Sequence, residues 1–221
     1  GIQTVQDLRV AHTPTLRAEF GVVIEKTQRE LQGIACIDLQ EVVPNKQQII
    51  SSRSFGSMVQ DVEVLKDAMS TFVANACAKL RAQDSHASVI QVFLQTNRFR
   101  KDLPQYMPSL AIPLPMPTND SLAVNKWACH LIDLMFKPEY QYKKAGVVLS
   151  EISPTSHIQG DLLTLETETN SRLMTAIDQL NTRFGRGAIK ISTQGAHRSW
   201  QMRQERKSPC YTTVWTELPI I

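Results

Sequence analysis

One cysteine and one histidine are adjacent in this 221-residue chain, and a thiol beside an imidazole could support nucleophilic catalysis. They are Cys129 and His130, within a segment expected to be helical. Neighbouring side chains on a helix point about 100° apart, so the two groups should diverge. Without a Cys-x-x-Cys spacing, a metal site or a disulfide framework is not expected, and the four cysteines are interpreted as free thiols.

Paired acids are the other candidates for catalysis. Asp61/Glu63 and Glu166/Glu168 are spaced i, i+2, which brings carboxylates together only on a strand. Both pairs fall beside an expected helix start or in a polar stretch, so solvated acids are the better interpretation. The sequence has no phosphate-binding glycine loop, Gly-x-Ser-x-Gly or His-Glu-x-x-His. We therefore expect no catalytic residues, metal ion or cofactor in this chain.

Phosphate binding is the chemistry that remains, and the stretch "QQIISSRSFG" is suited to it. Hydroxyl and guanidinium groups are donors to phosphate oxygens. Alternation along a strand from Gln47 gives two sets, of which one must pack on helices. These sets are Ile49, Ser51, Arg53 and Phe55 on one face and Ile50, Ser52 and Ser54 on the other.

A second cationic stretch runs from Arg183 to Lys207, although the formal net charge of the chain is only +3. It contains seven Arg and Lys residues and a single acid, Glu205. Such a local excess of positive charge can neutralise phosphates. Interleaved aromatic residues such as Trp200 could stack on single-stranded DNA. The same residues could instead form a surface for a protein partner, or be solvated cations around a buried tryptophan.

The helices and strands that would position these residues are expected to form an α+β fold. Periodicity indicates the order β-α-β-β-α-β, with both helices on one face of a four-stranded sheet and the other face left for solvent or a partner. The prolines at 113 and 115 require an edge strand or a bulge. The expected strands are 47–55, 88–98, 109–116 and 142–152, and the helices are 62–81 and 120–136.

Helical segments flank this unit. Thr4 and Asp7 predict the start of a first helix, and two further helical stretches end at Gly33. A helix over 171–180 is followed by a glycine turn that should lead into a short strand. A start on Gly1 without methionine suggests a fragment. With 42% hydrophobic residues and no apolar run of about 20, a soluble intracellular protein is expected.

Taken in order, these features resemble the carboxyl-terminal half of UmuC-type Y-family translesion DNA polymerases, the catalytic subunits of DNA polymerase V. "KQQIISSRSFG" and "SWQMRQERKSPCYTT" carry the resemblance most specifically, because fold periodicity does not dictate them. It covers essentially the whole chain. It implies a thumb portion at 1–40, a linker at 41–46, a little finger at 47–153 and a partner-binding region at 154–221. The catalytic carboxylates and their Mg²⁺ would lie in a palm domain outside this chain.

The resemblance also implies binding residues. Primer-template DNA would lie along the little finger without being read for sequence. The expected DNA-binding residues are Ser51, Ser52, Arg53, Ser54, Phe55, Thr96, Asn97, Arg98, Tyr142, Lys143 and Lys144. A loose clamp-binding peptide would use Gln159, Leu162, Leu163 and Leu165. Those leucines could equally pack on the helix at 171–180.

In this family the tail is associated with RecA and with the processed UmuD dimer. The tail residues expected to bind a partner or DNA are Arg198, Trp200, Arg203, Arg206 and Lys207. The resemblance implies a role in SOS damage tolerance in the bacterial cytoplasm, at the nucleoid when DNA is bound. The rival hypothesis is a protein-interaction module for the β sliding clamp, RecA or a UmuD-type partner, with little DNA contact of its own.

Overall fold

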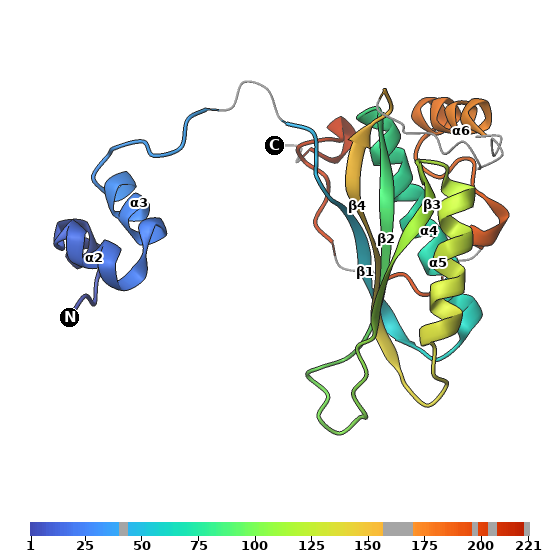
Figure 1. Cartoon of the computed structure of the whole chain (residues 1–221), viewed down its shortest axis with the longest axis horizontal. Coiled ribbons are helices and arrows are strands. Elements are labelled where there is room, and N and C mark those ends of the chain that lie inside the picture. Colours follow the sequence, from blue (N-terminus) through green and yellow to red (C-terminus); the bar gives the residue numbers. More distant parts are fainter. Residues whose placement is uncertain (40–43, 157–169, 196–198, 203–206, 219–221) are drawn as a thin grey trace. The chain divides into compact units, whose positions relative to one another are not determined.

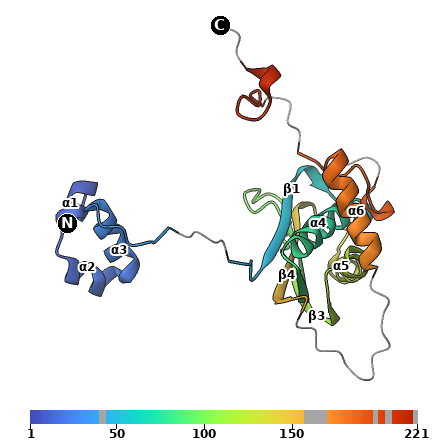
Figure 2. The same cartoon turned by 90° about the horizontal axis from the view of Figure 1, so that it is seen from above.

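A computed structural model describes residues 1–39, 44–156, 170–195, 199–202 and 207–218. The chain divides into two compact units, residues 1–44 and residues 45–221, shown in Figure 1 and Figure 2. No helix within the described ranges has the length and apolar character that spanning a membrane requires.

The first unit has three short helices, α1 (Val5–Val10), α2 (Thr13–Phe20) and α3 (Val22–Leu31). The predicted start of α1 is confirmed: the Asp7 backbone N–H donates to Thr4 Oγ1 at 3.1 Å, and the Asp7 carboxylate accepts from the Thr4 N–H at 2.9 Å. This reciprocal cap satisfies two of the free N–H groups at the helix start.

The interior of this first unit is largely polar. Glu25, only 4% exposed, accepts from Arg17 at 3.1 Å and from Arg29 at 2.5 Å. The buried Gln28 amide donates to the Ala11 carbonyl at 2.5 Å, which joins α3 to the end of α1. Hydrogen bonds, more than apolar burial, thus hold these three helices together.

The second unit contains one antiparallel sheet of β1 (Ile49–Val59), β2 (Ser85–Thr96), β3 (Ser109–Thr118) and β4 (Tyr142–Pro154). Its order is β1-β4-β2-β3. Figure 1 shows α4 (Val62–Ala82) and α5 (Ser121–Met135) on the same side of this sheet. The predicted α+β class, element order and single helical face are confirmed.

The core lies between that helical face and the sheet. Helix α4 buries Leu65, Phe72 and Leu80, and the sheet contributes alternate residues such as Ile90 and Leu94. Each such side chain stabilises the fold by about 1.5–3 kcal/mol through removal from water. Side-chain caps set the helix starts: Asp61 accepts from the Glu63 N–H and Asp120 from the Leu122 N–H.

The position of β3 agrees with its prolines. It is an edge strand, and the register between β2 and β3 shifts between Ala87 and Val89. Pro113, paired with Val89, is therefore next to an irregularity, where a missing backbone donor costs least.

Beyond the sheet, α6 (Ser171–Phe184) packs through Met174, which is buried, and through an ion pair. Arg81 of α4 donates to both carboxylate oxygens of Asp178, at 2.5 and 2.8 Å. The short strand predicted after Gly185 is wrong. The Asn181 side chain bonds both the N–H and the carbonyl of Ile189, so this backbone needs no strand partner, and a 3₁₀ turn follows at Ser192–Gln194.

Trp200 packs the C-terminal region against the sheet unit. Its indole, 4% exposed, makes edge contacts with Phe72 at 5.4 Å and Phe55 at 6.3 Å between ring centroids. Its carbonyl accepts from the Gly56 N–H at 3.1 Å. A side chain at Gly56 would collide with the Gln201 backbone, so glycine is what permits this approach.

Trp200→Ala should lower the free energy of unfolding by about 3–5 kcal/mol, because it removes a buried indole and both ring contacts. Urea unfolding followed by circular dichroism measures the change. Trp215→Ala is the matched control, since Trp215 is 87% exposed. Equal unfolding midpoints for the two variants would show that Trp200 does not anchor this region.

Candidate nucleic-acid interface

The sheet face opposite α4 and α5 carries a patch of polar side chains around one aromatic ring. Strand register places side chains in three rows across β1, β4 and β2. We call this surface the open face, and its rows are Ile50–Val148–Gln91, Ser52–Gly146–Phe93 and Ser54–Lys144–Gln95.

The middle row explains why the open face is flat at its centre. A side chain at Gly146 would collide with the Ser52 Cβ and with the Phe93 ring, so the ring occupies the space above this glycine. The Lys144 ammonium lies 5.8 Å from the centroid of the same ring. A cation–π contact thus holds a positive charge over the sheet between two neutral polar residues.

The predicted DNA-binding residues of β1 divide between the two faces. Ser52 and Ser54 lie on the open face, whereas Ser51, Arg53 and Phe55 share the other parity. Phe55 is fully buried in the core, and Ser51 is 9% exposed. The side chain of Phe55 is therefore unavailable to a ligand, and Arg53 is exposed on the helical side of the sheet.

Three predicted residues on β2 and β4 are also engaged inside the protein. Lys143 Nζ donates to the Phe55 carbonyl at 2.5 Å, at the irregularity in β1. Tyr142 is fully buried, and its hydroxyl accepts from the Lys137 N–H at 2.9 Å. Thr96 is buried and donates to Gln105 Oε1 at 2.9 Å.

The loop between β2 and β3, residues 97–108, is a second cationic feature, and Figure 1 shows it extending past the end of the sheet. It contains the predicted Asn97 and Arg98. The Arg98 guanidinium lies 5.0 Å from the centroid of Phe99, which is 79% exposed. Lys101 is also exposed.

Sequence reasoning missed Phe99 and Lys101 in this loop. The signal was present, because "NRFRK" sets three cations around an aromatic residue in an expected turn. One of these cations, Arg100, pairs with Asp102 at 2.6 Å and holds the pKa of that carboxyl down at about 2. Arg98 and Lys101 remain available to a ligand.

Aromatic stacking supports this end of the sheet. The rings of Tyr106 and Tyr140 stack with centroids 4.7 Å apart, and Lys137 Nζ lies 4.7 Å from the Tyr106 ring. Tyr106 belongs to the β2–β3 loop, and the other two precede β4. The base of the cationic loop is thereby joined to the neighbouring loop.

The remaining predicted sites are a mixed set. Gln159, Leu162, Leu163 and Leu165 lie outside the described residues, as do Arg198, Arg203 and Arg206. Lys207 is exposed, while Trp200 is in the core, which agrees with the alternative of a buried tryptophan. In the described ranges no three His, Cys, Asp or Glu residues are grouped so as to hold a metal ion.

Cys129 and His130 diverge as the helix geometry predicts. The Cys129 sulfur is 4.0 Å from Asn125 Oδ1, whereas the His130 ring is exposed and makes an edge contact with Trp127. Burial raises the pKa of the Cys129 thiol. This environment disfavours the thiolate that a nucleophilic cysteine needs.

Comparison with known proteins identifies the family. The model of the impB/mucB/samB family C-terminal domain matches residues 46–162, more than half of the chain. The chain belongs to this family. A domain of unknown function, DUF4113, matches residues 171–221. The resemblance to UmuC-type proteins expected from the sequence is thus confirmed.

Curated relatives align along the chain. Protein UmuC of Salmonella typhimurium strain LT2 is 36% identical over 220 residues, 99% of this chain. Protein ImpB of Salmonella typhimurium is 36% identical and Protein MucB of Escherichia coli 37% identical, each over 222 aligned positions. The chain spans about half the length of these relatives, 52% in each case.

Two solved structures are similar to part of the chain. The insertion ternary complex of Dbh DNA polymerase aligns with 70% of this chain and 42% of its own, at 19% identity and a TM-score of 0.40. A Y-family DNA polymerase chimera of Dbh and Dpo4 aligns over the same shares, at 14% identity and a TM-score of 0.42.

The buried thiols should be the slowest to alkylate. Burial raises the pKa of Cys77 to about 12, so about one molecule in ten thousand carries this thiolate at pH 8. We expect iodoacetamide, followed by peptide mass spectrometry, to label Cys36 before Cys77 and Cys129. In urea the differences should vanish. Faster labelling of Cys129 than of Cys36 in the folded protein would indicate an activated nucleophile instead.

Proposed function

We propose that this chain is the DNA-holding part of a UmuC-type Y-family translesion DNA polymerase, acting in SOS damage tolerance in the bacterial cytoplasm. Its open face would bind primer-template duplex, while nucleotide transfer takes place in a palm domain outside the chain. The observation that carries the proposal is the row of Ser54, Lys144 and Gln95 beside Ser52 on a sheet face that α4 and α5 leave uncovered. Family membership supports it.

The chemistry of this face suits a sugar-phosphate backbone. Hydroxyl groups, amides and one ammonium group can donate to phosphate oxygens, and such contacts position DNA without reading its sequence. The Gln91 amide, which could otherwise read a base edge, donates to Ser109 Oγ at 2.8 Å. Indifference to sequence is what a polymerase that copies damaged template requires.

The size of the face also fits a duplex. Rows from Ile50 to Ser54 cover about 13 Å along β1, from the rise per residue of a strand, and the three strands of the open face cover about 10 Å across. The major groove of B-DNA is about 12 Å wide, so the face can contact phosphates on both sides of a groove. Arg98, Phe99 and Lys101 on the β2–β3 loop would extend the contact along the backbone.

The proposal also includes protein partners. A β sliding clamp would bind through Gln159, Leu162, Leu163 and Leu165, and RecA or a processed UmuD-type dimer through the tail that includes Lys207. Magnesium would be bound by the palm domain.

Removing two cations should weaken duplex binding. For Lys144→Ala/Arg98→Ala we expect about tenfold lower affinity for a fluorescent primer-template at moderate salt. The slope of log K against log salt should become shallower by about 1.8, at about 0.9 per lost phosphate contact. Two unrelated DNA sequences should give the same result in fluorescence anisotropy.

Lys126→Ala/Arg172→Ala is the control, since it removes the same charge from exposed positions of α5 and α6. Its affinity should stay within about twofold of the parent chain. Equal affinities for both double variants would refute duplex binding by the open face. That result would favour the protein-interaction module.

A further inference from the structure

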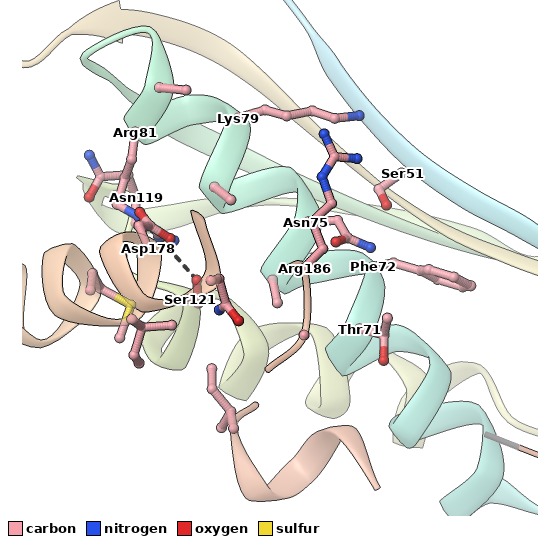
Figure 3. A pocket seen from close by; sticks show the side chains of 18 of the residues that line it. Ser51, Thr71, Phe72, Asn75, Lys79, Arg81, Asn119, Ser121, Asp178 and Arg186 are labelled. Carbon is pink, nitrogen blue, oxygen red and sulfur yellow. Dashed lines mark hydrogen bonds and ion pairs between the residues drawn. The ribbon is translucent and has the colours of Figure 1, made fainter. Parts of the chain in front are cut away.

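A second cationic surface lies on the helical side of the sheet, away from the open face. It is a groove between β1, α4 and the region of α6 with the turn that follows it, seen closely in Figure 3. Segments 50–54, 71–82, 171–191 and 200–202 contribute to its walls. The groove therefore exists only because the C-terminal region packs on the sheet unit.

The charge balance of the groove is positive. Five Arg and Lys side chains line it, against three Asp side chains and no Glu. Two of these acids are already engaged: Asp178 pairs with Arg81, and Asp120 caps α5 and accepts from Asn170 at 3.2 Å. Arg53, Lys79, Arg183 and Arg186 remain in excess of the third acid, Asp84.

Several donors in this groove have no partner among the residues that the structure describes. Within the described ranges no hydrogen bond or ion pair engages the side chains of Arg53, Asn75, Lys79 or Arg186. In Figure 3 the side chains of Lys79 and Arg186 point into the same part of the groove, beside Ser51 and Asn75. Two cations that share a space repel each other, and a bound anion would relieve that repulsion.

We propose that this groove binds the phosphodiester backbone of single-stranded DNA. Asn75 and Lys79 are one turn apart on the same side of α4, so they offer an amide and an ammonium group in line. Arg186 supplies a guanidinium group from the opposite wall, which can donate twice to one phosphate. The site thus brings one amide donor and two cations together.

The lining argues for a single strand bound through its backbone. The aromatic residues Phe72 and Trp200 are buried beneath the surface, so they cannot stack on bases. Between the charged residues α4 presents the small side chains of Ala74, Ala78 and Ala82. A recess flanked by two helices and a strand admits one chain, whereas a duplex needs the flat surface on the other side of the sheet.

The groove adds to the duplex binding proposed for the open face and does not depend on it. The two sites meet at β1: residues 50–54 all border the groove, while the register places the side chains of Ser52 and Ser54 on the open face. A strand that separates from a bound duplex could pass over this edge.

The test uses the whole chain and a fluorescein-labelled oligothymidylate of about 20 nucleotides, longer than one binding site. Lys79→Gln/Arg186→Gln should lower the affinity about tenfold at low salt, and flatten the salt dependence by about 1.4, at about 0.7 per single-strand phosphate. Lys126→Gln/Arg172→Gln, which loses the same charge outside the groove, should stay within about twofold.

A duplex probe separates this site from the open face. The groove variant should bind duplex within about twofold of the parent, and Lys144→Ala/Arg98→Ala should keep its affinity for oligothymidylate. Asn75→Asp, which puts a carboxylate among the cations, is a second variant and should also weaken single-strand binding. Circular dichroism checks that each variant is folded.

Other results would overturn the proposal. Groove variants that bind oligothymidylate as tightly as the Lys126→Gln/Arg172→Gln control would show that the groove is not the single-strand site. Groove-dependent binding of a polyglutamate peptide, with no binding of oligothymidylate, would instead assign the groove to an acidic protein partner.

Discussion

The two-residue alternation of β1 is the constraint on which both surfaces of this protein depend. Successive side chains of a strand point to opposite faces, so Phe55 enters the core while Ser52 and Ser54 stay on the open face. Shifting the register by one residue would bury the serines and expose the phenylalanine. The ring contacts of Phe55 with Trp200 hold that register, because they engage only one of the two sets.

One glycine on β1 and one on β4 allow other groups to approach the sheet closely. Gly56 lets the backbone at Trp200 and Gln201 approach the edge of β1, and Gly146 leaves space for the Phe93 ring across the centre of the sheet. One glycine thus serves the attachment of the C-terminal region and the other the shape of the open face. Both roles concern close approach, and neither requires a left-handed backbone.

Periodicity and caps were sufficient to predict most of the fold. Thr4 and Asp7 indicated a helix start, and Pro113 indicated an edge strand, because these signals act within a few residues. The candidate site was predicted less well. Alternation showed that β1 has two faces without deciding which one the helices cover, and that choice depends on packing against residues far away in the sequence. The partners of Lys143 and Trp200 are of this kind.

The prolines of β3 have a consequence for how other molecules can attach to this domain. Pro113 and Pro115 have no backbone N–H to donate on this edge strand, which disfavours pairing of an extended peptide beside them as a fifth strand. The same two prolines disfavour pairing of this edge with the edge strand of another copy. A protein that docks at this edge would therefore bind mainly through side-chain contacts, and its affinity would depend on which side chains it presents.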